Sequence, residues 1–560
     1  MKTGPAVYYR KEGYDTAGQR LLGRQAAGEG FLRGLARYGR GQPLYCYAPG
    51  SHEFEDFSRR VSDWSGRAAQ VREIPFGNLV GLREPGLLYL PYPGIAEAAW
   101  QRRRVSSRNH SICGVTHTIA SREVLAAIGD FLTAPVEPWD ALICTSAAVR
   151  GAVDDLLGRW GEYLAERTGG RPEARLQLPV IPLGIDCDRF DATPHAADAG
   201  RRLREQHGIA PSDTVILYVG RLIFYAKAHP VPMYMALERA AAATGRRLHL
   251  IQAGWFEEPG EEQEFRRAAQ AFAPSVSAIF LDGRDPGVRA SVWHAADIFV
   301  SLSDNIQETF GITPIEAMAA GLPVVVSDWD GYRESVRDGI DGFRVPTLVP
   351  PPGTGADLAS SYLDDRINYS TFIGYVAMCT AVDVDACASA LARLVGDPEL
   401  RRQMGEQGRR REREVYDWRR VIATYEDLWD ELTAIRSAGP SPVAERSATS
   451  QHPILNDPFR FYARYPTAAL EDGTLLGPGE QSSPDRVELL FAAASGRLGR
   501  TARTSEKTLL AVVAAVRERG PTPVSDLVRA YAGENPIAAT RLRRSLVYLL
   551  KFDVLKQVGT

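Results

Sequence analysis

The sequence predicts an α/β protein made of two doubly wound halves that face each other, plus a small, mainly helical C-terminal domain. Short apolar runs rich in β-branched and aromatic residues alternate with amphipathic helical stretches, which is typical of βα units in a parallel sheet. Two such series occur, and they meet near residue 190. A chain of 560 residues is too long for a single core, which also favours two or three domains.

The first series occupies residues 1–190. Helical stretches such as "GEGFLRGLARYG" separate its strands, and the turn-rich segment "LPVIPLGIDCDRF" ends it. The predicted strands of this series are 6–11, 43–49, 86–93, 111–119 and 140–146.

The second series occupies residues 191–414 and follows the charged segment "RRLREQHGIAPSD". Each of its apolar runs is again followed by a helical pattern, so a second parallel sheet is expected. Its predicted strands are 214–222, 247–254, 277–283, 297–303 and 322–328. Ligands of such sheets bind at the carboxyl ends of the strands, so we expect the binding site between the two halves.

The C-terminal part of the chain has a different composition. Residues 435–485 contain Pro/Ser/Gly-rich stretches and are predicted to be a linker. Residues 486–560 show three helical patterns and a short strand, an order similar to a winged helix. In the last helix, one face carries apolar residues, and Arg541 and Arg544 are predicted to lie away from it. These apolar residues are Leu542, Leu546, Leu549 and Leu550.

Composition excludes several classes of protein. The net charge is only −3, so no global field selects a polyanionic partner. The first residues lack an apolar signal core, and no run of about twenty apolar residues occurs, so a cytoplasmic protein is expected. The six cysteines show neither a C-x-x-C spacing nor a histidine at ligand spacing, so we expect buried thiols and no zinc site.

The stretch "SDNIQETFGITPIEAMAAG" carries the strongest chemical signal. Thr313, Pro314 and Glu316 have the spacing of a helix capping box, which is a purely structural interpretation of Glu316. Glu308 is harder to explain structurally, because the amides near Gly311 would favour an anion, and a carboxylate there would repel phosphate. The amides near Gly311 and the Glu308 carboxylate can both bind one ligand if that ligand has hydroxyl groups beside its phosphates.

A sugar joined to a nucleoside diphosphate has this combination of groups. Its pyrophosphate needs hydrogen-bond donors, and its sugar and ribose hydroxyls need acceptors. Arg221 follows the strand that ends in Gly220, and Lys227 lies six residues further on. Two such cations opposite an amide-lined helix start would form a clamp for a diphosphate, although two isolated surface cations are more often simply solvated.

With these residues in place, residues 5–435 resemble the retaining glycosyltransferase family 4 (glycosyltransferases group 1). The resemblance rests on the E-x7-E spacing from Glu308 to Glu316, on "VGRL…K", on "LDG…WHAADIFVS" and on "GYRESVRDGIDGFRV". It implies the GT-B fold, with two facing Rossmann-like domains and a helix at about 415–434 that crosses back to complete the first domain. It also implies hexosyl transfer from a UDP- or GDP-linked sugar with retained anomeric configuration and without a cofactor or metal.

The resemblance assigns a role to individual residues. Glu308, His117, Arg221 and Lys227 would act at the reacting centre, with Glu308 accepting hydrogen bonds from the donor sugar. The remaining residues would bind the donor: Gly28, Gly30, Gly283, Arg284, Phe310, Gly311, Ile312, Thr313 and Glu316. Two departures from the family pattern affect loop details, namely the extra polar residues of "SLSDNIQE" and the position of Lys227, one later than is commonest. Taken alone, His117 at a strand end is more often a structural hydrogen-bonding residue.

Several alternatives stay open on the sequence. The D-x-D pairs Asp328/Asp330 and Asp383/Asp385 are typical of metal sites in another glycosyltransferase fold. A sugar phosphorylase on the same fold and a nucleic-acid-binding regulator acting through 486–560 are rival functions. A glycan or lipid-linked glycan is the favoured acceptor. Residues 486–560 would dock a second subunit or a partner protein, and basic clusters such as 101–108 would allow peripheral contact with the inner membrane face.

Overall fold

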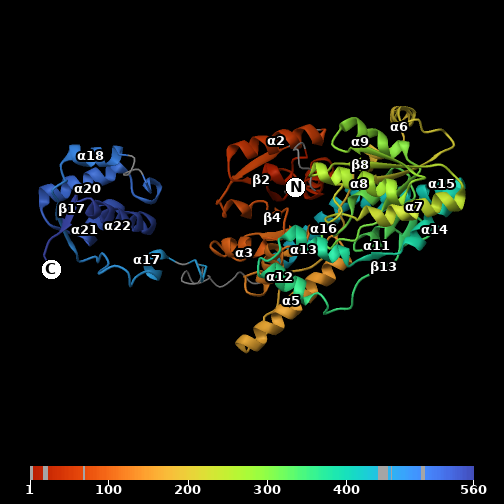
Figure 1. Cartoon of the computed structure of the whole chain (residues 1–560). Helices are drawn as coiled ribbons and strands as arrows, with labels where there is room; N and C mark the ends of the chain where they lie inside the picture. The colour runs from red at the N-terminus through yellow and green to blue at the C-terminus, as the bar shows by residue number, and fades with distance from the viewer. Residues whose placement is uncertain are drawn as a thin grey trace. The chain divides into compact units, whose positions relative to one another are not determined.

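The computed structural model describes residues 4–16, 23–66, 70–438, 452–455, 457–493 and 498–559. The chain divides into two compact units, Met1–Gln451 and His452–Thr560, and Figure 1 gives the order of their elements. Within the described residues, no helix is both long and apolar enough to cross a membrane.

The first unit opens with a six-stranded parallel sheet in the order β3-β2-β1-β4-β5-β6. Every residue of the central strands β2, β4 and β5 is buried, as expected for a parallel sheet covered on both faces. The strands are β1 (Ala6–Tyr8), β2 (Leu44–Ala48), β3 (Val71–Pro75), β4 (Leu87–Leu90), β5 (Ser111–Val115) and β6 (Ala141–Ile143). The main helices are α1 (Gly23–Tyr38), α2 (Ser51–Ser65), α3 (Ile95–Arg103), α4 (Arg122–Gly129) and α5 (Ala147–Thr168).

A second six-stranded parallel sheet follows, in the order β12-β11-β10-β7-β8-β9. Its strands are β7 (Thr214–Val219), β8 (Leu248–Gly254), β9 (Ser277–Asp282), β10 (Ile298–Ser301), β11 (Val324–Ser327) and β12 (Gly342–Val345). Its helices are α6 (Pro194–Gln206), α7 (Pro230–Thr244), α8 (Pro259–Phe272), α9 (Pro286–Ala295), α10 (Ile312–Ala319), α11 (Tyr332–Ser335), α14 (Val384–Gly396) and α15 (Pro398–Arg411). Five of these helices have proline in the first turn, where its fixed φ fits the helix and no amide is lost. The two doubly wound halves predicted from the sequence are therefore confirmed.

A helical hairpin interrupts the second half after its last strand. It consists of α12 (Ala356–Leu363) and α13 (Tyr369–Met378). The short antiparallel strands β13 (Thr347–Leu348) and β14 (Ala381–Val382) pair at its base. This pairing joins the two ends of the hairpin to each other.

Helix α16 (Trp418–Ala438) packs onto the first sheet, although it follows the whole second half in the sequence. Its apolar face, from Trp418 to Leu432, shares one core with α1 and with strands of the first sheet. The Trp418 indole lies against Gly30, Gly34 and Gly184, where an added Cβ would come within 3.1, 2.9 and 2.7 Å of indole atoms. This contact leaves no room for a side chain at the last two positions.

The second unit is small and has its own core. Its helices share this core with an antiparallel sheet in the order β16-β15-β17. Its elements are α17 (Pro458–Phe461), β15 (Leu475–Pro478), α18 (Pro484–Ala492), α20 (Glu506–Arg519), β16 (Thr522–Pro523), α21 (Val524–Ala532), α22 (Pro536–Lys551) and β17 (Leu555–Gln557).

Two sequence predictions fall in this C-terminal region. The linker predicted for 435–485 is too long, because α16 continues to Ala438 and β15 pairs with both other strands of the small sheet. Residues 439–451 of that linker lie outside the described residues. In α22 the predicted face is confirmed, since Leu542, Leu546 and Leu549 are buried and Leu550 packs against them. Arg541 and Arg544 are exposed, also as predicted.

Candidate functional site

The Lys227 ammonium and the Glu308 carboxylate meet beside the carboxyl ends of neighbouring strands. Lys227 lies in the loop after β7, and Glu308 in the loop after β10, which pairs with β7. Lys227 Nζ donates to Glu308 Oε2 at 3.1 Å, with 29% of the lysine side chain and 15% of the glutamate side chain exposed. Ligand sites of parallel sheets form at this edge, so the structure brings together two of the four residues expected at the reacting centre.

The electrostatics of this pair keep Glu308 ionised. Burial alone would raise the pKa of the Glu308 carboxyl, but the Lys227 charge and hydrogen bond and the Thr309 and Phe310 amides lower it. The net direction is downward. A buried carboxylate that stays charged is an acceptor only, which suits the hydroxyl groups of a sugar.

Helix α10 begins differently from the sequence prediction. Its N-cap is Gly311, without a side-chain cap. Thr313 and Glu316 therefore lie inside the helix, and the predicted capping box is wrong. Gly311 has φ 86°, and a Cβ there would meet Tyr332 Cε1 at 1.9 Å, so only glycine fits this turn. The helix consequently starts two residues earlier than a Thr313 cap would allow, and the first amides of Ile312 and Thr313 lie at its N-terminus.

Glu316 is free of a capping role and lies partly buried in α10. Burial raises the pKa of its carboxyl to about 7, against a smaller lowering effect of the Arg189 charge. A carboxyl with this pKa carries a proton part of the time at neutral pH, so it both donates and accepts hydrogen bonds.

Arg221 and His117 lie with other partners. Arg221 Nη1 is 3.7 Å from Glu257 Oε1, and both side chains are mostly buried. His117 Nε2 is 3.1 Å from the Pro91 carbonyl oxygen, which can only accept, so Nε2 carries the proton. Burial chiefly lowers the pKa of His117, against the raising effect of the Pro91 hydrogen bond and with a smaller lowering effect of the Arg24 charge, and the net pKa is about 4. The imidazole is therefore neutral at pH 7, with Nδ1 as an acceptor.

The predicted donor-binding glycines all make close contacts with protein atoms. A Cβ at Gly28 would lie 2.3 Å from the Gly13 carbonyl oxygen, and Gly30 faces Trp418. A Cβ at Gly283 would lie 3.1 Å from Gly254 Cα. Arg284, the next residue, pairs with Asp282 at 2.9 Å and lies over the Trp255 ring.

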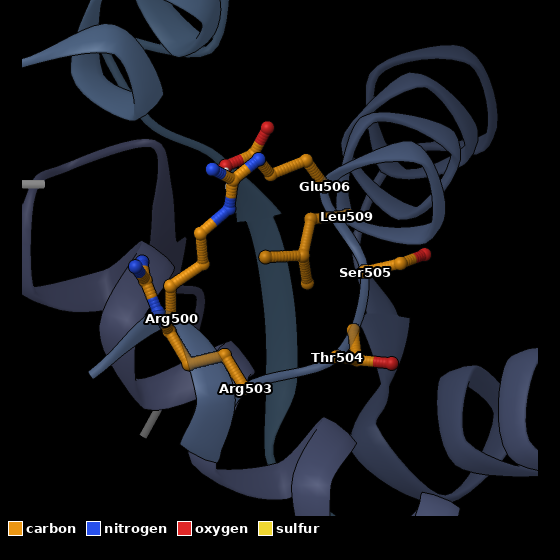
Figure 2. A pocket seen from close by; sticks show the side chains of 6 residues that line it. All are labelled: Arg500, Arg503, Thr504, Ser505, Glu506 and Leu509. Atoms are coloured by element: carbon orange, nitrogen blue, oxygen red, sulfur yellow. Dashed lines mark ion pairs between the residues drawn. The ribbon is translucent and has the colours of Figure 1, made fainter. Parts of the chain in front are cut away.

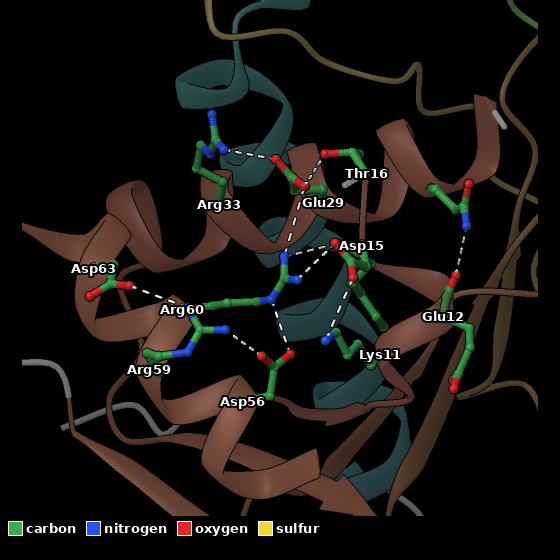
Figure 3. A network of polar contacts seen from close by, with 12 residues as sticks. Lys11, Glu12, Asp15, Thr16, Glu29, Arg33, Asp56, Arg59, Arg60 and Asp63 are labelled. Carbon is green, nitrogen blue, oxygen red and sulfur yellow. Dashed lines mark hydrogen bonds and ion pairs between the residues drawn. The ribbon is translucent and has the colours of Figure 1, made fainter. Parts of the chain in front are cut away.

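An ion-pair network holds the chain just before α1 against α1 and α2. Arg60 bridges Asp56 at 3.0 Å, Asp15 at 3.1 Å and Glu29 at 3.8 Å, and Figure 3 shows it among these carboxylates. Glu29 also accepts from the Thr16 hydroxyl at 2.6 Å. Residues 17–22 lie outside the described residues. They include Leu21 and Leu22, the first two residues of the segment "LLGRQAAGEGFLRGLAR", which contains Gly28 and Gly30 and resembles the family's glycine-rich loop.

The D-x-D pairs have structural partners. Asp328 pairs with Arg344 at 3.2 Å, Asp385 pairs with Arg239 at 2.6 Å, and Asp383 caps α14. Asp330 has φ 42° and accepts from the Ser146 hydroxyl at 2.7 Å. No group of three or more His, Cys, Asp or Glu suited to a metal ion occurs in the part of the chain that the structure describes.

Two buried carboxyls with a raised pKa were missed by sequence reasoning, Asp304 in the loop that carries Glu308 and Asp330 after β11. Burial raises the pKa of Asp304 and of Asp330 to about 7 in each case. For Asp330, the Glu308 charge adds to this effect. The polar insertion "SDNIQE" was the only sequence signal for Asp304, and nothing in the D-x-D spacing indicated that Asp330 lies near Glu308.

The second unit contains a cavity of about 240 Å³ at the start of α20. Figure 2 shows its lining, which is Arg500, Arg503, Thr504, Ser505, Glu506 and Leu509. Arg500 pairs with Glu506 at 3.1 Å, and Arg503 lies over the Tyr548 ring at 3.7 Å. The two guanidinium groups thus have protein partners within the unit.

The model of one known protein family matches the part of the chain that contains Lys227 and Glu308. Residues 200–352, which include Arg221, Lys227, Glu308 and Glu316, match the family model of glycosyl transferases group 1. The chain is thus similar to the glycosyl transferases group 1 over this part of its second half.

Individual relatives are similar to part of the chain. A D-inositol 3-phosphate glycosyltransferase of Nocardia farcinica is 32% identical over 171 residues, which is 29% of this chain and 37% of the relative. One from Geodermatophilus obscurus is 32% identical over 247 residues, 42% of this chain and 50% of the relative. The chain thus spans half or less of the length of these two relatives. Among solved structures, Anabaena Alr3699/HepE in complex with UDP aligns at 16% identity with a TM-score of 0.48, covering 77% of this chain and 100% of that one.

Proposed function

We propose that this protein transfers a hexose-like unit from a nucleoside diphosphate sugar to an acceptor, with retention of anomeric configuration and without a metal. The observation that carries the proposal is the Lys227–Glu308 pair, which lies at the ends of β7 and β10 inside the segment that matches glycosyl transferases group 1. It supplies one cation and one ionised acceptor at a single point of the sheet edge.

The cations would stabilise the leaving diphosphate. Lys227 is 3.1 Å from Glu308 and Arg221 is 3.7 Å from Glu257, so both cations are already held by carboxylates on the same edge. A diphosphate that enters would take over part of each cation's interactions and spread its developing charge over them. Glu308 would then accept from the hydroxyl groups of the donor sugar.

The other residues would orient the two parts of the donor. Glu316 would bind the ribose hydroxyls, and the Ile312 and Thr313 amides at the start of α10 would face the distal phosphate. The free Nδ1 of neutral His117 would accept from a sugar hydroxyl. No carboxylate is assigned as a covalent nucleophile. The acceptor would attack on the face from which the diphosphate departs, and its proton would pass to the leaving phosphate oxygen.

The test is a screen of UDP- and GDP-linked hexoses for release of nucleoside diphosphate, first by hydrolysis and then with candidate glycan acceptors. Glu308→Gln and Lys227→Met should each lose most of the turnover of the best donor. Asp385→Asn is the control, because that carboxylate also pairs with a cation but is 88% exposed on α14. Equal turnover in all three variants would contradict the assigned site.

Two further measurements check the chemistry. Proton NMR of the product should show the anomeric configuration of the donor, and an inverted product would refute retention. Turnover should persist in a chelator, and its complete loss with recovery on adding manganese would refute metal independence. Formation of sugar 1-phosphate from inorganic phosphate would favour the phosphorylase alternative.

The unit His452–Thr560 is proposed to dock a second subunit or a partner protein and to add no catalytic group. Its exposed Arg541 and Arg544 support an interaction surface on α22. A chain ending at Gln451 should therefore retain donor turnover. Soluble, folded truncated protein without any turnover would refute this division, and salt-dependent binding of nucleic acid by the full chain, lost in an Arg541→Ala/Arg544→Ala variant, would favour the regulator alternative.

A further inference from the structure

The hairpin α12–α13 contacts the first half of the enzyme as well as its own half. Arg122, at the start of α4, donates to the Leu363 carbonyl oxygen at 3.0 Å and to Asp365 at 2.6 Å. Its guanidinium lies 5.0 Å from the centre of the Tyr362 ring. The matched family segment ends at residue 352, so this hairpin lies beyond it.

A small apolar cluster joins the hairpin to both halves. Its buried members are Ala120 of the first half, Ile223 and Ala226 of the second half, and Ile373 of α13. Partly buried aromatic and aliphatic side chains pack around it, namely Tyr225, Ile306, Tyr369 and Phe372. The loop that carries Lys227 therefore packs directly on the hairpin.

Within this cluster, the Tyr369 hydroxyl connects the two halves through hydrogen bonds. Tyr369 donates to Gln307 Oε1 at 3.3 Å, and its oxygen is 3.3 Å from the Thr118 hydroxyl. Because a tyrosine hydroxyl has a single proton, Thr118 must be the donor in the second contact. Thr118 follows His117 in the chain, and Gln307 precedes Glu308. The bridge therefore joins the two residues that are next in sequence to His117 and Glu308, which are assigned to the reacting centre.

The bridge continues to the lysine loop. Gln307 Nε2 donates to the Ala226 carbonyl oxygen at 2.6 Å, and Ala226 precedes Lys227. Asn305 Nδ2 donates to the Tyr225 carbonyl oxygen at 2.8 Å and lies 3.5 Å from the Ile373 carbonyl oxygen of α13. These bonds satisfy loop carbonyl groups that would otherwise be buried without a partner, which fixes the path of the loop.

We infer that Tyr369 is a positioning residue, which holds the His117 loop of the first half and the Lys227 and Glu308 loops of the second half in one arrangement. This inference rests on the proposed function. Both oxygen–oxygen distances exceed the usual value of about 2.7–2.8 Å for a hydroxyl donor, so the bridge can shorten when the two halves hold a substrate. The hydroxyl itself touches no group that reacts.

The first test compares Tyr369→Phe with Tyr375→Phe in release of nucleoside diphosphate from the best donor of the screen. Tyr375 is the matched control, because it lies on the same helix α13 with 50% of its side chain exposed. Tyr369→Phe removes both hydrogen bonds of the hydroxyl. At roughly 2- to 3-fold in kcat for each long bond, their loss corresponds to a fall of about 5- to 10-fold, with the donor KM within about 2-fold and the melting temperature unchanged. Equal kcat in the two variants would overturn the inference.

A double-variant cycle adds a readout that a purely structural role would not move. If the bridge acts as one connection, Thr118→Val combined with Tyr369→Phe should lower kcat no further than Tyr369→Phe alone. Independent, multiplying losses would mean that the two hydroxyls act separately and would also overturn the inference.

A second measurement needs no turnover. Amide hydrogen exchange should become faster in both 116–122 and 223–229 in Tyr369→Phe, and remain unchanged there in Tyr375→Phe. Change in neither loop, or in only one of them, would refute a bridge between the halves. If the unsubstituted protein turns over no donor, the proposed function fails, and the exchange data still decide whether Tyr369 couples the two loops.

Discussion

The substitution Asp304→Asn tests the burial of a carboxyl in the loop that carries Glu308. Asp304 is 3% exposed, and its Oδ2 accepts from the His229 amide at 3.2 Å. Its Oδ1 is buried, and no hydrogen-bond partner for it is found among the described residues. Burial raises the pKa of this carboxyl from 3.8 to about 7. Asparagine has the same shape and can keep the bond to His229, but it has no charge to bury.

The direction in which stability changes with pH follows from the protons bound by the folded and the unfolded chain. Below pH 4, Asp304 is protonated in the folded and the unfolded chain. Between pH 4 and pH 7 the unfolded chain has released this proton while the folded chain still holds it, so the free energy of unfolding falls as the pH rises. Above pH 7 the loss is complete. A difference of about three pH units at about 1.4 kcal/mol each gives about 4 kcal/mol as its upper limit.

The assay is urea unfolding of both proteins at pH 5, 6, 7 and 8, followed by tryptophan fluorescence. All nine tryptophans precede His452, so the signal reports the first unit alone. The Asn variant should gain stability relative to the unsubstituted protein as the pH rises from 5 to 7, and keep that gain at pH 8. A difference that is independent of pH, or one that shrinks as the pH rises, would refute the burial argument.

Three further outcomes are expected. Lys227→Ala and Arg221→Ala should each lower kcat by an amount equivalent to about 2–4 kcal/mol, and unchanged turnover in steady-state assays would remove their role at the leaving group. Glu316→Ala should weaken nucleoside diphosphate binding in calorimetry without lowering the melting temperature, since Gly311 and not a side chain caps α10; unchanged affinity would remove the ribose role. Gly311→Ala should cost more than about 3 kcal/mol of stability, because its Cβ would overlap Tyr332, and an unchanged melting temperature would contradict that overlap.

Most of the strands that were predicted from the sequence are buried on both faces, but the edge strand β9 was predicted as well, and all of its residues are exposed or partly exposed. Continuous apolar runs such as "TVILYV" and "LHLIQAG" have no other compact solution, and both form central strands. The edge strands β3 and β12 were not predicted. Strand β12 is mostly buried, but it has only four residues and begins with glycine. Four of the five residues of β3 are exposed or partly exposed, so its pattern lacks the signal on which strand prediction depends.

Some residues of the candidate site could likewise be predicted from the sequence, and others could not. Lys227 and Glu308 could be predicted because their spacing from strand ends is local and the motif carries it. The Tyr369 bridge could not, because its partners lie 62 and 251 positions away in the chain. The raised pKa of Asp304 and of Asp330 is also a property of burial, and the sequence does not show which carboxyl the fold will cover.

The packing of α16 has a consequence for the order in which the protein is made. One face of the first sheet is covered partly by residues 418–438, so this half lacks its final helix until the whole second half has left the ribosome. During that interval the apolar side chains of Val7, Phe31 and Tyr89 lack their α16 neighbours. The second half contains all of its own strands and can complete its core first. Nascent chains released before Trp418 should therefore be prone to aggregation, whereas chains released after Ala438 should be soluble.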